Sequence, residues 1–417
     1  MNIPCIKCKG ADPLNACGRS FCPIIAKSEA MFKVKETMAT DSFFGSSPAP
    51  FVGRVGYPFV NIGILSPPEH RDDAWLFDAP KHWANENFSI PEIIDFRSAL
   101  INSRFTANVR DKSKFLEISR EVGMASKPVD IEVKLKDKPR FKLNTDPYVA
   151  PMGPNAALKK IEITENPKID FKVEKVVDDS DLRAGDALIY LYKHDFDENF
   201  LSRLLSVGTL GLKTDRKVVP TRWSITATDD NIGKFLINKI KTYNQADYCA
   251  YFGGYLGNYY LILVFPEVWS YELFETYLPR ASWNVNSNET SYMTDFESYG
   301  GRKNYAENTS GGYYAARLPI LEKLDALKRQ ASILVLRFIT GEYAVPLGVW
   351  VCRESVRKAM QAKPINFASK ELMLKYAESL VKKKFGYDLN NILKNSILLR
   401  NLKKQTKLNR FLTAQHL

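Results

Sequence analysis

The sequence predicts an α+β protein in which a mixed β-sheet core is followed by C-terminal helices. Residues Val129–Leu135 alternate strictly between apolar and charged side chains, which is typical of a half-buried strand. The apolar runs Tyr259–Phe265 and Ile333–Leu336 are too short to cross a membrane and predict further strands. Ser89 followed by Pro91 has the pattern of a helix N-cap with proline in the first turn. The core therefore combines strands and helices.

Length and charge limit the class of protein. With 417 residues, 45% hydrophobic and 12% aromatic, the chain can bury a large core and is not a disordered protein. Its formal net charge of +12 favours polyanionic partners. Residues 381–410 hold nine lysines or arginines against a single acid, Asp388. Such a run is either a solvated helix face or a segment that lies near DNA.

The sequence shows no sign of a membrane or secretory segment. No apolar run is long enough to cross a bilayer, and the N-terminus carries cysteines and lysines where a secretory signal would be apolar. We therefore expect a cytoplasmic protein with no membrane partner. In that reducing compartment, the six cysteines favour metal binding or free thiols over disulfides.

Four cysteines, Cys5, Cys8, Cys17 and Cys22, lie within the first 22 residues. They form a Cys-x2-Cys pair and a Cys-x4-Cys pair around a Lys-Gly-Ala-Asp-Pro segment, whose residues favour turns. Two such pairs can supply four thiolates to one tetrahedral Zn²⁺. With four protein ligands and no open position, the predicted zinc knuckle would be structural. The alternative is a set of buried core cysteines.

The chain is predicted to contain five parts: a zinc knuckle (1–26), a linker helix with a Gly/Ser/Pro-rich linker (27–50), the mixed α+β core (51–365), basic C-terminal helices (366–404) and a tail (405–417). Predicted helices span 27–40, 89–102, 111–124, 199–207, 229–243 and 318–328, and others begin near 354, 369 and 388. Further predicted strands span 160–164, 169–177, 187–193, 222–226, 332–340 and 344–352, with a hairpin turn at 257–258.

The tail has the pattern of a docking peptide. Leu408, Phe411 and Leu412 lie at i, i+3 and i+4, so one helical turn places them on one side, with Gln405 one turn earlier. Three apolar anchors and one amide suit a shallow apolar groove on another protein. The segment resembles the PIP box by which replication and repair proteins bind the sliding clamp PCNA, with Leu412 in place of an aromatic residue. The alternative is the last turn of a helix packed on its own domain.

Together, the four-cysteine segment, the mixed core and the terminal peptide resemble the archaeal Nre (NreA/NreB) DNA repair proteins. The resemblance covers the layout of the whole chain, and its specific motifs are the four cysteines and the segment 405–412. It implies participation in DNA damage repair through PCNA, with Zn²⁺ as the bound metal, and it supplies no catalytic residues. We expect a repair factor that is recruited by the clamp and binds DNA.

A tyrosine-rich stretch is a candidate for contacts with DNA bases. Thirteen of the 20 tyrosines lie between Tyr243 and Tyr314. Tyrosine rings can stack on bases, but they also pack well on strands within a core. The sequence leaves both roles open.

The alternative function is an NAD-dependent enzyme acting in repair. In sequence order, His194, the glycines of segment 208–211, Ser224 on a predicted strand and Glu342 resemble the layout of a mono-ADP-ribosyltransferase. That resemblance implies that the glutamate orients the ribose hydroxyl or the acceptor, while the serine strand and the histidine hold NAD. A lone histidine or glutamate is more often structural. Whether the core is an enzyme stays open at this point.

Overall fold

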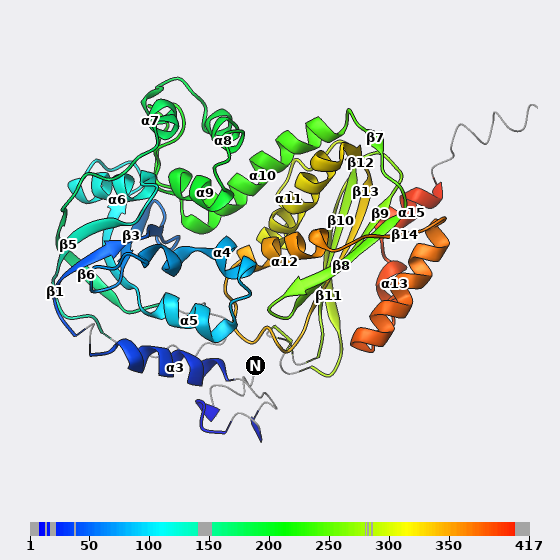
Figure 1. Ribbon diagram of the computed structural model, residues 1–417, viewed down its shortest axis with the longest axis horizontal. Helices are drawn as coiled ribbons and strands as arrows, with labels where there is room; N and C mark the ends of the chain where they lie inside the picture. The colour runs from blue at the N-terminus through cyan, green and yellow to red at the C-terminus, as the bar shows by residue number, and fades with distance from the viewer. Residues whose placement is uncertain are drawn as a thin grey trace, which may run out of the picture. The chain divides into compact units, whose positions relative to one another are not determined.

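The computed structural model describes residues 8–12, 15–16, 22–36, 39–140, 152–279, 281, 283–284 and 287–404 (Figure 1). The chain separates into two compact units. The first comprises Met1–Phe235 and Gly341–Val351, and the second comprises Leu236–Thr340 and Cys352–Leu417. Each unit has its own β-sheet packed with helices, so the predicted α+β class is confirmed. Residues 51–365, predicted as one core, contribute to both units.

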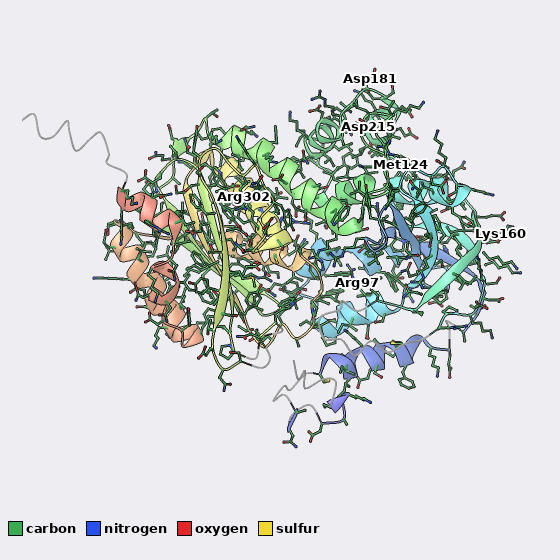
Figure 2. All side chains as sticks on the ribbon, turned by 180° about the vertical axis from the view of Figure 1, so that it is seen from behind. Arg97, Met124, Lys160, Asp181, Asp215 and Arg302 are labelled. Atoms are coloured by element: carbon green, nitrogen blue, oxygen red, sulfur yellow. The ribbon has the colours of Figure 1, made fainter. Side chains whose placement is uncertain are left out.

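The first unit contains a six-stranded sheet in the order β1-β5-β6-β4-β3-β2. Its strands are β1 (Ser42–Ser47), β2 (Ala49–Val52), β3 (Phe59–Ser66), β4 (Ile101–Asn108), β5 (Val129–Leu135) and β6 (Asn155–Ile163). Strands β4 and β6 run parallel, and the other neighbouring pairs are antiparallel. Strand β5 has the predicted bounds, with its apolar residues buried and Glu132 and Lys134 exposed. Lys160, labelled in Figure 2, lies on β6.

The helices of this unit are α3 (Pro23–Val34), η1 (Ala74–Asp78), α4 (Pro80–Asn85), α5 (Ile90–Ser98), α6 (Lys114–Met124), α7 (Phe171–Asp178), α8 (Ala184–Tyr192), α9 (Glu198–Ser206) and α10 (Thr221–Ile240), which continues into the second unit. The predicted cap at Ser89 is confirmed as a capping box with Glu92, whose carboxylate accepts from Ser89 N at 2.7 Å. The helix ends at Ser98, earlier than predicted, because β4 begins at Ile101.

Residues 42–50, predicted as a linker, form β1 and the start of β2. The small residues allow close packing here and do not confer flexibility. A Cβ added to Gly45 would lie 2.2 Å from the carbonyl oxygen of Pro67. The hydroxyl of Ser47 is buried and donates to Leu65 O at 2.7 Å. A composition that is typical of linkers therefore also suits a strand that a neighbouring backbone approaches closely.

Three predicted strands of the first unit are wrong, because residues 169–177, 187–193 and 222–226 lie mainly in helices α7, α8 and α10. The side chain of Asp170 accepts from Lys172 N at 2.8 Å and caps α7. In α8, Ala187, Leu188 and Leu191 are buried at i, i+1 and i+4, which is a helical stripe. A short apolar run is compatible with both the helical and the strand period. In α7, the N-cap at Asp170 favours the helix.

The second unit contains another six-stranded sheet, in the order β11-β10-β13-β9-β8-β14. Its strands are β8 (Cys249–Tyr255), β9 (Asn258–Phe265), β10 (Ser270–Tyr277), β11 (Ser291–Glu297), β13 (Ser332–Ile339) and β14 (Ile365–Asn366), and β7 (Asn244–Gln245) pairs with β12 (Arg329–Gln330) separately. The predicted hairpin is confirmed, with its turn one residue earlier than predicted: Leu256 and Gly257, both with positive φ, connect β8 to β9, which begins at Asn258.

Helices pack on both faces of the second sheet, namely α11 (Ser310–Leu327), α12 (Trp350–Gln361), α13 (Lys370–Phe385), α14 (Asn390–Leu393) and α15 (Ile397–Lys404). Figure 1 shows α11 on one side and α13 with α15 on the other. The helix predicted to begin near 369 is confirmed as α13, and the hydroxyl of Ser369, its N-cap, accepts from Leu372 N. The strand predicted at 344–352 is wrong, since β13 ends at Ile339 and α12 begins at Trp350.

Six of the thirteen tyrosines in the tyrosine-rich stretch belong to the core of the second unit. The buried tyrosines between 243 and 314 are Tyr251, Tyr255, Tyr260, Tyr271, Tyr313 and Tyr314. Burial raises the pKa of Tyr260, Tyr271 and Tyr313 well above the usual value for a phenol. Their rings face the interior, so they are not available to stack on bases.

No helix among the described residues is long and apolar enough to cross a membrane.

Candidate functional site

The N-terminal cysteines are described only in part. Cys8 and Cys22 lie among the described residues, and Cys5 and Cys17 lie outside them. After Cys8 the chain turns sharply, with positive φ at Lys9 and Gly10. Ala11 N donates to Cys8 O at 2.8 Å, and Asp12 N donates to Cys8 Sγ at 3.3 Å.

This turn fits a metal-binding thiolate. An N–H donated to sulfur stabilises the charged thiolate, which is the form that coordinates zinc. No group of three or more metal-ligating side chains occurs within the described part of the chain, which holds two of the four predicted ligands. The four-cysteine zinc site therefore stays a prediction.

The two remaining cysteines, Cys249 and Cys352, are buried in the second unit. Burial raises the pKa of Cys249 to about 11 and also raises the pKa of Cys352. Both are therefore protonated thiols at neutral pH, as core cysteines are expected to be.

The predicted docking residues, Gln405, Leu408, Phe411 and Leu412, all lie outside the described residues, which end at Lys404. The structure instead gives the base of the tail, helix α15. A buried carboxylate holds the start of this helix. Ser396 Oγ donates to Glu272 Oε2 at 2.5 Å, Leu398 N donates to the same oxygen at 3.0 Å, and Ile397 N donates to Oε1 at 2.9 Å.

Glu272 belongs to β10, far from α15 in sequence, and it supplies the acceptors that the first turn of this helix lacks. Burial raises the pKa of Glu272, and the bonds from Ser396, Ile397 and Leu398 oppose that rise. The sequence gives no sign of this role, because a glutamate in a strand is usually a solvated side chain. No local signal in the sequence identifies its partners.

The two faces of α15 differ in chemistry. Leu398 and Leu399 are buried in the core of the second unit, and Leu402 packs against that core. Arg400, Lys403 and Lys404 are exposed. Exposed lysines and arginines continue over the neighbouring helices at Lys375, Lys382, Lys383, Lys384 and Lys394. The helix therefore joins a fixed apolar base to a cationic surface directly before the tail.

The candidate catalytic residues lie in helices or in an exposed connection. His194 follows α8 and is exposed, with its Nδ1 2.8 Å from Tyr190 O and its ring 4.4 Å from the Tyr190 ring. Ser224 is buried in α10, where its Oγ donates to Thr221 O at 2.9 Å. The serine strand of the transferase layout is therefore a helix at this position. Glu342 is exposed in the connection between β13 and α12.

Two family models cover nearly the whole chain. The model described as "Archaeal Nre, N-terminal" matches residues 16–284, and the model described as "Archaeal Nre, C-terminal" matches residues 297–411. The second match extends through most of the predicted docking segment.

Three named relatives are similar over most of their length. A DNA repair protein NreA from Haloferax volcanii is 38% identical over 79% of this chain and 80% of its own length. A DNA repair protein NreA from Archaeoglobus fulgidus is 38% identical over 92% of this chain and 95% of its own length. A DNA repair protein NreB from the same organism is 35% identical over 97% of this chain and 99% of its own length. No solved structure matches the chain significantly. With both family models matched and named relatives aligned over 79% to 97% of its length, this chain belongs to the archaeal Nre family.

Proposed function

We propose that this protein is a DNA repair factor that is recruited to the sliding clamp PCNA by its C-terminal tail and binds DNA. The similarity to proteins named as DNA repair proteins, over up to 97% of this chain, carries the repair role. The proposal assigns no chemical reaction to the core. His194 and Ser224 are hydrogen-bonded to backbone carbonyls of their own segments.

The clamp contact rests on the pattern Gln405, Leu408, Phe411 and Leu412 and on the base that precedes it. Helix α15 is fixed to β10 through Glu272 and ends at Lys404, one residue before Gln405. The exposed Lys403 and Lys404 at the end of this helix suit a docking site close to DNA. Binding then depends on a few apolar anchors in a groove of the clamp.

Truncation of the anchors tests the clamp contact. Phe411→Ala should weaken clamp binding by on the order of 2–4 kcal/mol, as expected for an interface hot spot, and Gln405→Ala should have a smaller effect. His416→Ala, outside the pattern, is the matched control and should bind normally. Calorimetric titration of the full chain with PCNA measures these differences. Undiminished binding by a chain that ends at Lys404 would sink the proposal.

We further propose that Cys5, Cys8, Cys17 and Cys22 hold one structural Zn²⁺. When bound, the metal joins the two cysteine pairs and supplies folding free energy to a segment too small to form a core of its own. The thiolate-stabilising bond from Asp12 N to Cys8 Sγ supports this assignment.

Metal analysis tests the zinc site. Protein purified without added zinc should contain close to one equivalent, and Cys8→Ser should lose most of it. Cys249→Ser, which changes a buried core thiol, is the control and should keep the metal. Metal-free protein with four titratable N-terminal thiols would contradict the assignment.

A further inference from the structure

Loops at one end of the first unit's sheet form a surface that neither the zinc segment nor the tail includes. Three segments meet there: the β2–β3 turn (53–58), the β4–α6 loop (109–114) and the stretch that leads into α10 (213–223). Backbone bonds join them. Val109 N donates to Pro58 O at 3.0 Å, and Val218 N donates to Val109 O at 2.8 Å. The fold therefore holds the three segments next to one another.

Two exposed aromatic rings from different segments make contact on this surface. The ring centroids of Tyr57 and Trp223 are 5.3 Å apart, and 42% and 44% of these residues are exposed. The turn before Tyr57 requires Gly56, whose φ is +85° and whose added Cβ would lie 2.7 Å from Phe59 O. Val52 N donates to the hydroxyl of Thr221, which fixes the strand next to the start of α10. The rings are therefore held in place and still face solvent.

Basic residues dominate these three segments, which hold eight lysines or arginines and two aspartates, an excess of six positive charges. The basic residues are Arg54, Arg110, Lys112, Lys114, Lys213, Arg216, Lys217 and Arg222. All of them except Arg216 are exposed. The acids are Asp111 and Asp215, and Asp215 is labelled in Figure 2. A protein partner would favour an aromatic patch with fewer charges, whereas this excess matches a polyanion.

We propose that this surface, the Tyr57–Trp223 patch, binds single-stranded DNA. The two rings stack on unpaired bases, and Arg54, Arg110 and Arg222 contact the phosphates around them. Bases within a duplex already stack on their neighbours, so the rings gain little from a duplex. A single strand offers free base faces together with a flexible backbone that the loops can follow. The inference rests on the proposed repair function and specifies the form of DNA that is bound.

Loss of the indole ring tests the stacking step. Binding of a labelled oligothymidylate of about 20 nucleotides is measured by fluorescence anisotropy with the full chain and no clamp. Trp223→Leu should bind about ten-fold more weakly or worse, whereas Trp223→Phe keeps a ring and should retain most of the affinity. Trp75→Leu is the matched control, because Trp75 lies on η1 of the same unit and is also 44% exposed. It should bind normally, and melting temperatures establish that all variants are folded.

Salt dependence tests the phosphate contacts. Arg222→Gln should reduce the slope of log affinity against log salt by about 0.7, the value for one contact to a single strand. Lys81→Gln, an exposed cation on α4, should leave the slope unchanged. The same titration with a DNA duplex of equal length should give weaker binding than the single strand, because bases in a duplex already stack on one another, and an RNA strand of equal length is titrated as the competing ligand.

The outcomes separate this inference from the function on which it rests. If the unaltered chain binds oligothymidylate and Trp223→Leu binds it equally well, the patch is wrong and the repair function stands. If the unaltered chain binds no DNA at low salt, DNA binding itself fails as part of the proposed function. Tighter binding of the duplex or of RNA, with the same loss in Trp223→Leu, would overturn single-stranded DNA as the ligand.

Discussion

The two six-stranded sheets differ in how far the side chains of their strands are exposed to solvent. Strand β5 of the first sheet alternates between buried apolar residues and side chains that reach solvent, such as Glu132 and Lys134. All eight residues of β13 in the second sheet are buried. The first sheet is therefore partly solvated on one face, whereas the strands at the centre of the second sheet are covered on both faces.

In a sheet that is covered on both faces, charged side chains must find their hydrogen-bond and ion-pair partners within the protein. Glu272 and Glu275 are three residues apart on β10, so they point to opposite faces. Glu272 accepts hydrogen bonds from the first turn of α15, and Glu275 forms an ion pair with Arg337 at 2.5 Å. Arg337 also donates to Asn258 Oδ1. In the first sheet, water can solvate such residues, and their exact partners matter less.

Breaking the buried pair should have the largest effect on stability. Arg337→Met leaves the Glu275 carboxylate buried without its cation, which should cost about 3–5 kcal/mol of unfolding free energy. Glu275→Leu combined with Arg337→Met removes both charges and should recover much of that loss. Urea denaturation measures both variants.

The first sheet offers the matched control for this experiment. Lys160 pairs with Glu162 at 2.9 Å on the solvated face, and 64% of the lysine side chain is exposed. Lys160→Met should leave the midpoint of urea denaturation unchanged within error. If Arg337→Met were as harmless as Lys160→Met, the contrast between the two sheets would be wrong.

The same contrast explains which elements the sequence could predict. Strand β5 was predicted to the residue because its solvated face imposes strict alternation. The predicted start of helix α13 near 369 agrees with the structure, in which Ser369 is the N-cap, a signal that lies within the local sequence. Residues 187–193 and 222–226 were predicted as strands because a short apolar or β-branched run fits both periods. What covers such a run is decided by parts of the chain that are distant in sequence.

The candidate sites divide in the same way. The cysteine spacing and the tail pattern are local, so the sequence alone shows both, although most of their residues lie outside the described part of the chain. Glu272 and the pair Tyr57 and Trp223 depend on contacts between distant segments. No window of sequence contains both partners, so no spacing could indicate them. The tyrosine-rich stretch had the right composition for stacking, but six of its thirteen tyrosines are buried, five are half-buried, and two, Tyr299 and Tyr305, are exposed.

Glu272 gives the smaller and finer test of the buried sheet. Glu272→Gln keeps the shape of the side chain, but its amide nitrogen cannot accept a hydrogen bond. One of the two oxygens that accept hydrogen bonds from Ser396 Oγ and from backbone N–H groups is therefore replaced by a donor. The loss should cost about 1–2 kcal/mol of unfolding free energy. Hydrogen exchange at 397–404 should become faster, since this carboxylate holds the first turn of α15. Glu132→Gln on the solvated face of β5 should change neither quantity.

The pH dependence of this variant reports the direction in which folding shifts the pKa of Glu272. Burial raises the pKa of folded Glu272 above its ordinary value of 4.5, so the fold binds this proton more tightly than the unfolded chain does. Its contribution to stability is complete below pH 4.5 and decreases as the pH rises through the raised value. The advantage of the native protein over Glu272→Gln should therefore shrink as the pH increases from 4.5, in urea titrations at matched ionic strength. An advantage that grew over this range would mean that the donors from α15 outweigh burial and hold the carboxylate in its charged form.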